Sequence, residues 1–252
     1  MLKNSVATNA AEHKTLLKVV NLTKSFGGVT AVKNVSFEVK EGGIFGLIGP
    51  NGSGKTTLFN LISGYIKPDS GRVIFDGEDI TGMSPHKICQ KGIARTFQIP
   101  QPFSNLTVFQ SVLAAVAFRR NRPMDPQKET FQILSFCGLA EKANLPCNKI
   151  TTVDKKFVEI ARALATKPKL LLLDEALAGL NPSELTEALE LIKRINMMGI
   201  TIIMVEHIIK AIIKVCEHVI VLASGEKIAE GAPLEIISNE RVIKAYLGAA
   251  YA

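Results

Sequence analysis

The chain has 252 residues, of which 47% are hydrophobic and 21% charged, and its formal net charge is +7. This length suits one domain, or one domain carrying a subdomain, and the composition excludes disordered and collagen-like chains. The lysines and arginines are spread along the sequence without a basic block, which favours a cationic surface over a nucleic-acid-binding segment.

No segment is both long enough and apolar enough to predict a membrane span. The longest hydrophobic region, residues 200–223, is interrupted by six charged or histidine residues, Glu206, His207, Lys210, Lys214, Glu217 and His218. The polar N-terminal stretch lacks the apolar centre of a signal peptide, and the four cysteines form no Cys-x-x-Cys pair. We therefore expect a cytosolic chain without disulfide or zinc site, linked to any membrane only through a partner.

The first third of the chain predicts short strands around a glycine-rich turn. Residues 1–15 are expected to be a flexible polar tail, and residues 16–252 the folded domain. Short strands are expected over 17–20 and 35–39, the second with alternating polarity. A fully apolar strand over 44–48 runs into the glycine-rich turn, a helix follows over 56–63, and residues 71–77 read as another strand.

The remainder predicts a helical insert and then a return to strands. From about residue 103 to residue 165 the apolar residues recur at helical spacing, which indicates a helical subdomain broken near 121–123. Buried strands are expected over 170–173, 201–205 and 219–222, with helical stretches between them. Strands that alternate with helices predict an α/β fold with a mostly parallel sheet covered on both faces.

A phosphate-binding motif is the strongest functional signal in the sequence. Residues 49–56 read GPNGSGKT, the full P-loop pattern, between an apolar strand and a helix. Glycines let successive backbone N–H groups point at phosphate oxygens, and the helix N-terminus adds partial positive charge. Lysine can reach the β- and γ-phosphates and threonine can ligate Mg²⁺. The predicted ATP-binding residues are Asn51, Gly52, Ser53, Gly54, Lys55, Thr56 and Thr57.

Two acids follow a buried strand, where a phosphoryl-transfer site needs carboxylates. Four leucines over 170–173 precede Asp174 and Glu175. Asp174 is predicted to hold the Mg²⁺ shell through water, and Glu175 to polarise the attacking water. The alternative is a strand that ends in a solvated acidic turn, and the upstream P-loop makes this the less favoured interpretation.

With these motifs in place, the chain from about Leu16 onward resembles the ABC ATPase family. The resemblance implies a P-loop NTPase core with an antiparallel β part and an inserted helical subdomain. It also implies that Phe26 stacks on adenine, that Gln98 contacts the metal and links the site to a membrane partner, and that residues 178–181 form the D-loop. His207 corresponds to the family's switch histidine. The implied catalytic residues are Glu175, His207 and Gln98, and the implied metal ligands are Thr56, Gln98 and Asp174.

Within that family the chain is most similar to the ATP-binding subunits of branched-chain amino acid importers. The segments that carry this similarity lie at residues 26–28, 94–98, 159–164, 178–182 and 242–248, while the stretch 118–131 is shorter than in that subfamily. The resemblance implies ATP hydrolysis coupled to import and a peripheral position on the cytoplasmic face of the membrane. The implied partners are transmembrane permease subunits and a second ATP-binding subunit, a paralogue or the chain itself.

The family's signature sequence is degenerate in this chain. Where the family carries Leu-Ser-Gly-Gly-Gln, residues 150–154 read ITTVD. Val153 places a β-branched side chain where a backbone N–H should approach phosphate. Thr151 and Asp154 are spaced as a capping box for the next helix, which is an alternative role for the segment. Ala176 replaces the proline that the family usually has after the catalytic acid.

Two other functions remain open at the level of the sequence. One is a soluble ABC ATPase that acts in translation or nucleic-acid processing, although such chains usually carry two cassettes and this one has a single P-loop. The other is a nucleotide-binding regulatory subunit with little turnover, which the valine in the signature sequence motivates.

Overall fold

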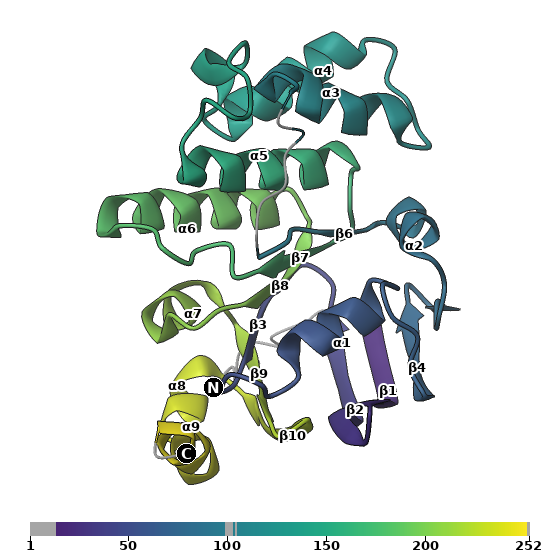
Figure 1. The fold of residues 1–252 in the computed structure, drawn as a ribbon, viewed down its shortest axis with the longest axis vertical. Coiled ribbons are helices and arrows are strands. Elements are labelled where there is room, and N and C mark those ends of the chain that lie inside the picture. Colours follow the sequence, from purple (N-terminus) through teal and green to yellow (C-terminus); the bar gives the residue numbers. More distant parts are fainter. Residues whose placement is uncertain (1–13, 99–102, 104, 251–252) are drawn as a thin grey trace, which may run out of the picture.

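The structure is a computed structural model that describes residues 14–98, 103 and 105–250, so residues 1–13 of the expected tail lie outside it. Two sheets organise the described residues (Figure 1). The smaller sheet is antiparallel, in the order β2-β1-β4-β5. Its strands are β1 (Thr15–Phe26), β2 (Val29–Lys40), β4 (Ser70–Phe75) and β5 (Glu78–Asp79).

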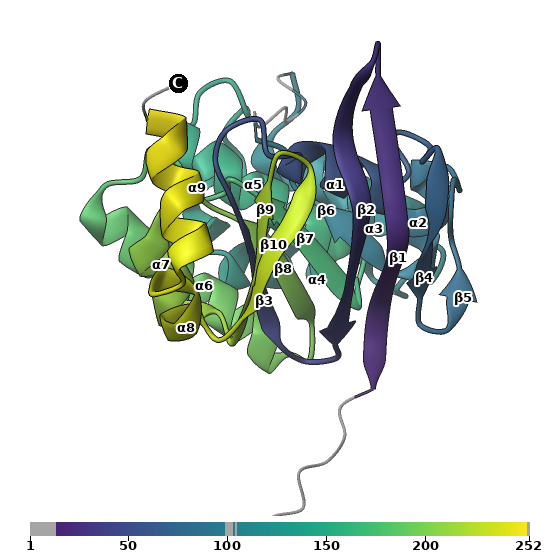
Figure 2. The same cartoon turned by 90° about the horizontal axis from the view of Figure 1, so that it is seen from below.

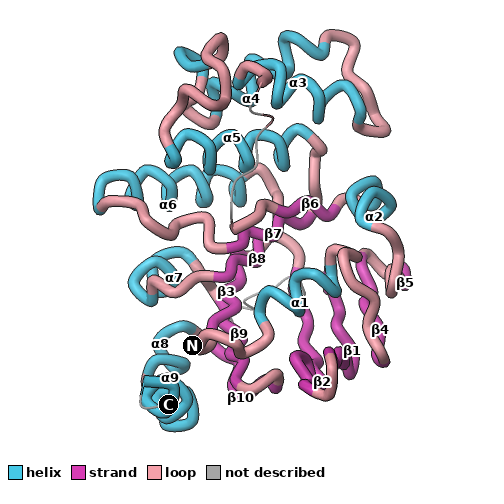
Figure 3. The backbone as a smooth tube through the Cα atoms, viewed as in Figure 1, coloured by secondary structure: helices cyan, strands magenta, loops and turns pink. Residues whose placement is uncertain are grey.

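The larger sheet has six strands in the order β10-β9-β3-β8-β7-β6 and forms the centre of the molecule (Figure 3). All neighbouring strands in it are parallel except β10 and β9. Its strands are β3 (Ile44–Ile48), β6 (Ile93–Arg95), β7 (Leu170–Asp174), β8 (Thr201–Val205), β9 (His218–Ala223) and β10 (Glu226–Gly231). β3, β7 and β8 are buried at every position, as expected for parallel strands covered on both faces.

Helix α1 (Lys55–Ile62) lies between the two sheets (Figure 2). Its side chains Leu58, Phe59, Leu61 and Ile62 join one hydrophobic cluster with residues of the small sheet and one face of the large sheet. α2 (Pro85–Lys91) follows the small sheet and leads into β6. The position of α1 is thus set by apolar packing against the small sheet on one side and the large sheet on the other.

The remaining helices form a layer that shares a second core cluster with the other face of the large sheet. α3 (Val108–Phe118), α4 (Pro126–Phe136) and α5 (Thr152–Ala165) pack on one another at the top of Figure 1, with a 3₁₀ turn at Ala140–Lys142. α6 (Pro182–Met197), α7 (Ile209–Val215), α8 (Pro233–Ile237) and α9 (Glu240–Ala250) complete this layer.

The predicted fold class is confirmed, because a mostly parallel sheet, an antiparallel sheet and a helical layer are all present. The expected break at 121–123 separates α3 from α4. The limits of the tail, at 1–15, and of the helical subdomain, at 103–165, stay predictions. Among the described residues, every helix is too short or too polar to cross a lipid bilayer.

Candidate active site

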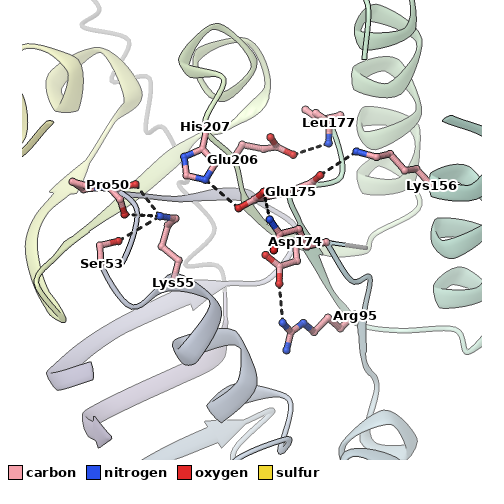
Figure 4. Close-up of polar contacts among 12 residues, drawn as sticks. Pro50, Ser53, Lys55, Arg95, Lys156, Asp174, Glu175, Leu177, Glu206 and His207 are labelled. Atoms are coloured by element: carbon pink, nitrogen blue, oxygen red, sulfur yellow. Dashed lines mark hydrogen bonds and ion pairs between the residues drawn. The ribbon is translucent and has the colours of Figure 1, made fainter. Parts of the chain in front are cut away.

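The predicted site residues gather at the carboxyl ends of three adjacent strands. β3 leads into the P-loop, β7 ends at Asp174, and His207 follows the end of β8, which lies between the other two strands. Figure 4 shows these side chains facing a common space. In open parallel sheets ligands bind at this edge, so the topology brings together residues that are far apart in sequence.

The P-loop has a backbone that only glycine allows at two positions. Gly49 has φ +154° and Gly54 has φ +103°, and a Cβ on either would lie 2.1 Å or 2.2 Å from a backbone oxygen, of Leu222 and Ala31 respectively. Gly52, with φ +75°, has open space instead. No side chain caps the N-terminus of α1, so the first N–H groups of that helix are left for an anion.

Lys55 is buried and turns back on its own loop. Its Nζ donates to the backbone oxygens of Gly49 at 2.8 Å and Pro50 at 2.9 Å, and to Ser53 Oγ at 3.4 Å. Burial lowers the pKa of Lys55, and the nearby carboxylates of Glu175 and Asp174 act in the opposite direction. The loop therefore keeps its shape through the same amine that is predicted to bind phosphate.

The geometry around Asp174 fits a divalent cation. Asp174 is buried, and its Oδ2 accepts a hydrogen bond from Nη2 of Arg95 at 2.7 Å. Its Oδ1 is buried with no hydrogen-bond partner among the described residues, while Thr56 is exposed at the start of α1. A carboxylate oxygen and a hydroxyl are ligands that Mg²⁺ or its bound water prefers.

The three predicted catalytic residues are joined by direct hydrogen bonds. Gln98 Nε2 donates to Glu175 Oε2 at 2.8 Å, and Nε2 of His207 lies 3.1 Å from Glu175 Oε1. Glu175 adopts φ +49°, a left-handed conformation unusual for a residue with a side chain, and its N–H donates to Val205 O at 3.0 Å. The strained turn thus aims the carboxylate between Gln98 and His207.

Two residues that sequence reasoning missed hold the turn after β7. Glu206, the residue between the end of β8 and His207 in the sequence, is buried and accepts a hydrogen bond from the Leu177 N–H at 2.8 Å. Nζ of Lys156 on α5 donates to the backbone oxygens of Ala176 at 3.3 Å and Ala178 at 2.5 Å. Burial raises the pKa of Glu206 to about 7. The sequence does not predict this pair, because lysine and glutamate are usually exposed and nothing near them in the sequence indicates that they are buried.

Phe26 lies at the end of β1, beside the hairpin turn, and is 48% exposed. The Nζ of Lys24 lies 5.5 Å from the centre of its ring. The following strand β2 abuts the P-loop, since Ala31 O is the atom that a Cβ on Gly54 would strike. The exposed ring is therefore available to a base, as expected, although its contact with adenine stays a prediction.

The degenerate signature segment forms a helix cap. Thr151 is the N-cap of α5: its Oγ1 accepts from the Asp154 N–H at 3.1 Å, and Asp154 Oδ2 accepts from the Thr151 N–H at 3.2 Å. The predicted capping box is thus confirmed. Val153 packs against the large core cluster, as does Ala176.

A groove of about 220 Å³ is lined by residues just after α1 and by residues of α2, β6 and α5, and it reaches Phe97, the neighbour of Gln98 in the sequence. Its wall includes Ser63, Tyr65, Arg95, Phe97, Glu159 and Arg162. Tyr65 is 52% exposed and Phe97 is 39% exposed, so the groove presents aromatic surface beside charged groups.

Comparison with known proteins assigns this geometry to a family. The ABC transporter family matches residues 32–178, and the branched-chain amino acid ATP-binding cassette transporter family matches residues 226–252. A probable branched-chain amino acid transport ATP-binding protein, LivG, of Archaeoglobus fulgidus is 37% identical over 246 residues, covering 93% of this chain and 96% of the relative. BraF, a high-affinity branched-chain amino acid transport ATP-binding protein of Pseudomonas aeruginosa, is 36% identical over 252 residues, covering 93% and 98%.

Solved structures agree with this similarity. The ADP conformation of an ATP-binding cassette of an ABC transporter matches with a TM-score of 0.85 and 32% identity, covering 93% of this chain and 99% of that one. A dimeric post-hydrolysis state of another ATP-binding cassette, bound to ADP and Pi, matches with a TM-score of 0.79 and 28% identity, covering 86% and 99%. The chain therefore belongs to the ABC transporter family, as an ATP-binding protein of the branched-chain amino acid type.

Proposed function

We propose that this chain binds ATP with Mg²⁺ at the edge of the large sheet and hydrolyses it to drive a branched-chain amino acid importer. The observation that carries the proposal is the position of Glu175. Its carboxylate is bonded to Gln98 on one oxygen and faces His207 on the other, one residue after the buried Asp174. This is the arrangement that activation of a water beside a bound triphosphate requires.

In the proposed binding step, residues 49–57 hold the triphosphate and Phe26 holds the base. Backbone N–H groups of the loop and of the α1 N-terminus bond to the phosphate oxygens. Lys55 exchanges its bonds to the loop oxygens for bonds to the β- and γ-phosphates. Thr56, Gln98 and Asp174 would hold Mg²⁺ or its waters, and the ion would supply positive charge beside the phosphates.

In the proposed hydrolysis step, Glu175 takes a proton from the attacking water, whose oxygen bonds to the γ-phosphorus while the bond from that phosphorus to the bridging oxygen breaks and ADP leaves. The carboxylate is fixed in direction by the hydrogen bond from Gln98, so it needs little reorganisation to meet the water. When the γ-phosphate is bound, His207 exchanges its contact with Glu175 for a hydrogen bond to the γ-phosphate oxygen where charge develops, and Gln98 keeps the carboxylate in place. Gln98 and His207 therefore sense whether the γ-phosphate is present.

The proposed partners are transmembrane permease subunits and a second ATP-binding subunit. The relatives' names describe them as transport ATP-binding proteins, and a similar cassette has been solved as a dimer. The groove beside Gln98 is the proposed contact for the permease, since a segment seated there touches Phe97, next to that glutamine. The chain would then lie peripherally on the cytoplasmic face of the membrane.

The experiment is reconstitution of the chain with its permeases in lipid vesicles. We expect Mg²⁺-dependent ATP hydrolysis to rise in the complex and to drive uptake of leucine, isoleucine or valine, and we expect Glu175→Gln to abolish both. Sedimentation of the native protein with membranes separates this function from the translation or nucleic-acid alternative, in which the protein stays in the soluble fraction. Uptake that does not respond to ATP, or turnover unaffected by Glu175→Gln, would contradict the proposal.

A second candidate is a regulatory subunit with little turnover of its own, favoured by the packing of Val153 against the core at the degenerate signature segment. ATP turnover of the isolated chain and of the assembled complex distinguishes the two functions. A regulatory subunit leaves turnover in the complex unchanged when its own Glu175 is replaced by glutamine.

A further inference from the structure

Arg95 is the residue that connects the groove to the buried carboxylate. It is the last residue of β6, and only 5% of its side chain is exposed. Its Nη2 donates to Asp174 Oδ2 at 2.7 Å, and its Nη1 donates to Asn60 Oδ1 at 2.6 Å and to Ser63 Oγ at 3.0 Å. The guanidinium is therefore fixed between the end of α1 and the end of β7 (Figure 4).

Three aromatic rings lie around the same guanidinium. Its central carbon lies 5.2 Å from the ring centre of Phe97, 5.6 Å from that of Phe59 and 5.8 Å from that of Tyr65. Tyr65 and Phe97 meet edge to face, with ring centres 5.4 Å apart, and both line the groove. A group seated on these two rings is thus separated from Asp174 by one side chain.

The contacts of Asp174 are unequal in a way that suits a metal site. Arg95 holds Oδ2, while Oδ1 has no hydrogen-bond partner among the described residues. Because Nη1 is bonded to Asn60 and Ser63, the planar guanidinium is held in place and presents Nη2 to Oδ2 from one fixed direction, which an ammonium on a flexible stem does less well. Carboxylates that serve metal ions are commonly oriented by such an outer hydrogen bond.

We propose that Arg95 is a positioning residue that orients Asp174 for Mg²⁺ and ties this carboxylate to the aromatic floor of the groove. The inference rests on the proposed function and extends it, because it names the side chain between the permease contact and the metal-binding carboxylate. A group that fills the groove therefore reaches Asp174 through the contacts of Tyr65 and Phe97 with Arg95.

The first test compares Mg²⁺ binding in variants of the full chain. Binding of a fluorescent ATP analogue is measured in EDTA and across a Mg²⁺ titration for the wild type, Arg95→Met, Arg95→Lys and Arg119→Met. Arg119 is a matched control, since its side chain is 6% exposed and paired with Glu129 at 2.6 Å. We expect Arg95→Met to need about 10- to 100-fold more Mg²⁺, Arg95→Lys to lie between it and the wild type, and Arg119→Met to match the wild type. Affinity in EDTA should stay the same in all four.

The second test examines the link to the groove. Phe97→Ala removes a ring from the guanidinium, and Phe103→Ala is the control because its ring stacks on Arg162, at 4.9 Å, instead. We expect the Mg²⁺ requirement to rise about 2- to 5-fold in Phe97→Ala, below the effect of losing an outer-shell hydrogen bond, and to stay unchanged in Phe103→Ala. Circular dichroism and thermal unfolding confirm that each variant is folded.

The outcomes distinguish a failure of the Arg95 role from a failure of the proposed ATPase function. A wild-type Mg²⁺ response in folded Arg95→Met overturns the role of Arg95, and so does an equal loss in Arg119→Met. If Arg95→Met does not fold, an unchanged response in both Arg95→Lys and Phe97→Ala overturns it. Lys55→Ala and Asp174→Asn serve as references. If these two also bind the nucleotide and Mg²⁺ normally, the proposed function fails; if only they are impaired, this inference alone fails.

Discussion

The imidazole of His207 lies 3.1 Å from a carboxylate oxygen of Glu175, although 32 positions separate the two residues in sequence. The contact exists because β7 and β8 are adjacent parallel strands that end at the same edge of the sheet. Gln98 holds the other oxygen of the same carboxylate. Glu175 is thus contacted on both of its carboxylate oxygens.

Replacing Glu175 with glutamine should slow ATP hydrolysis by about 10²- to 10⁴-fold while nucleotide binding persists. The amide keeps the size of the side chain and accepts no proton from water. Turnover and nucleotide affinity are measured together, and gel filtration with ATP should show an accumulated dimer. Glu78→Gln, at an exposed surface pair with Lys91, is the control. Full turnover in Glu175→Gln would show that another group is the base.

His207→Ala should reduce kcat strongly and leave the affinity for ATP nearly unchanged, because the histidine is expected to contact only the γ-phosphate. The matched control is His218→Ala, since His218 also lies 3.1 Å from a glutamate, Glu230, and has similar exposure. A loss of about 10²-fold is expected for the first variant, within the range for one charge-stabilising donor, and none for the second. Equal effects of the two substitutions would contradict this role.

Lys55→Ala should weaken ATP binding and abolish hydrolysis, because the phosphates lose a charged donor. The variant also loses the bonds to Gly49 and Pro50 that hold the loop in shape. Nucleotide affinity is measured by fluorescence, and unfolding temperature checks the fold. Lys33→Ala, which breaks only a surface pair with Glu226, provides the comparison. Wild-type affinity in Lys55→Ala would refute the phosphate role.

Glu206 should make the stability of the fold depend on pH. Burial raises its pKa to about 7 from an ordinary value of 4.5, with Lys156 opposing and Glu175 reinforcing the shift. Between these two pKa values the folded chain keeps a proton on Glu206 that the unfolded chain releases. The contribution of this proton to the free energy of unfolding is therefore fully present below about pH 4.5 and is lost as pH rises through about 7.

The measurement is urea unfolding of the wild type and Glu206→Gln between about pH 5 and pH 8. Glutamine still accepts the hydrogen bond from the Leu177 N–H but does not titrate. The free energy of unfolding of the variant should therefore rise by about 2–3 kcal/mol relative to that of the wild type as the pH goes from 5 to 8. Glu187→Gln, on the exposed face of α6, should show no such trend. Parallel pH profiles for the wild type and Glu206→Gln would show that burial does not shift this carboxyl group.

Val153 should make the two ATP sites of a dimer unequal. In the family's head-to-tail dimer, a homodimer of this chain carries two degenerate signatures. A heterodimer with a paralogue carries one complete site, built from this chain's Lys55, Asp174, Glu175 and His207. We therefore predict a heterodimer in which Glu175→Gln removes most ATPase activity and the equivalent change in the partner removes little.

Equal losses from the two glutamine substitutions, or rapid hydrolysis by the purified homodimer, would contradict this asymmetry. Val153→Gly should raise activity at the weak site if the valine itself causes the defect. The same substitution removes apolar packing against the core, so the unfolding temperature of the variant is measured alongside.

The sequence predicted the elements that bear strong periodic or motif signals. The expected strands at 44–48 and 201–205 coincide with β3 and β8, and the helix expected over 56–63 lies within one residue of α1. The short strands β5 and β6 carry two and three residues, too few for a periodic pattern, and their places depend on pairing with distant strands. Strand order in the small sheet is likewise set by tertiary packing.

For the site, sequence motifs identified residues by type and order, and the structure shows how they meet. Glu175, Gln98 and His207 were expected in one site, and their direct hydrogen bonds follow from strand order. Arg95 lies in the segment 94–98, which carries the family resemblance. Its ion pair with Asp174 joins positions far apart in the sequence, so no local sequence pattern predicts it. Lys156 and Glu206 were missed for the same reason, because contacts between distant positions decide the burial of a charged side chain.

The place of β8 between β3 and β7 sets the width of the site. Neighbouring strands lie about 4.8 Å apart, so the axes of β3 and β7 lie roughly 10 Å apart, with β8 between them. We expect a chain of three phosphates anchored at the loop to extend toward Glu175 and His207, and a diphosphate to stop short of them. The spacing of the strands should thus let the site distinguish a triphosphate from a diphosphate. We expect triphosphate to draw the turn that carries His207 toward the P-loop and diphosphate to leave that turn in place. Hydrogen exchange at residues 206–208 measures the difference.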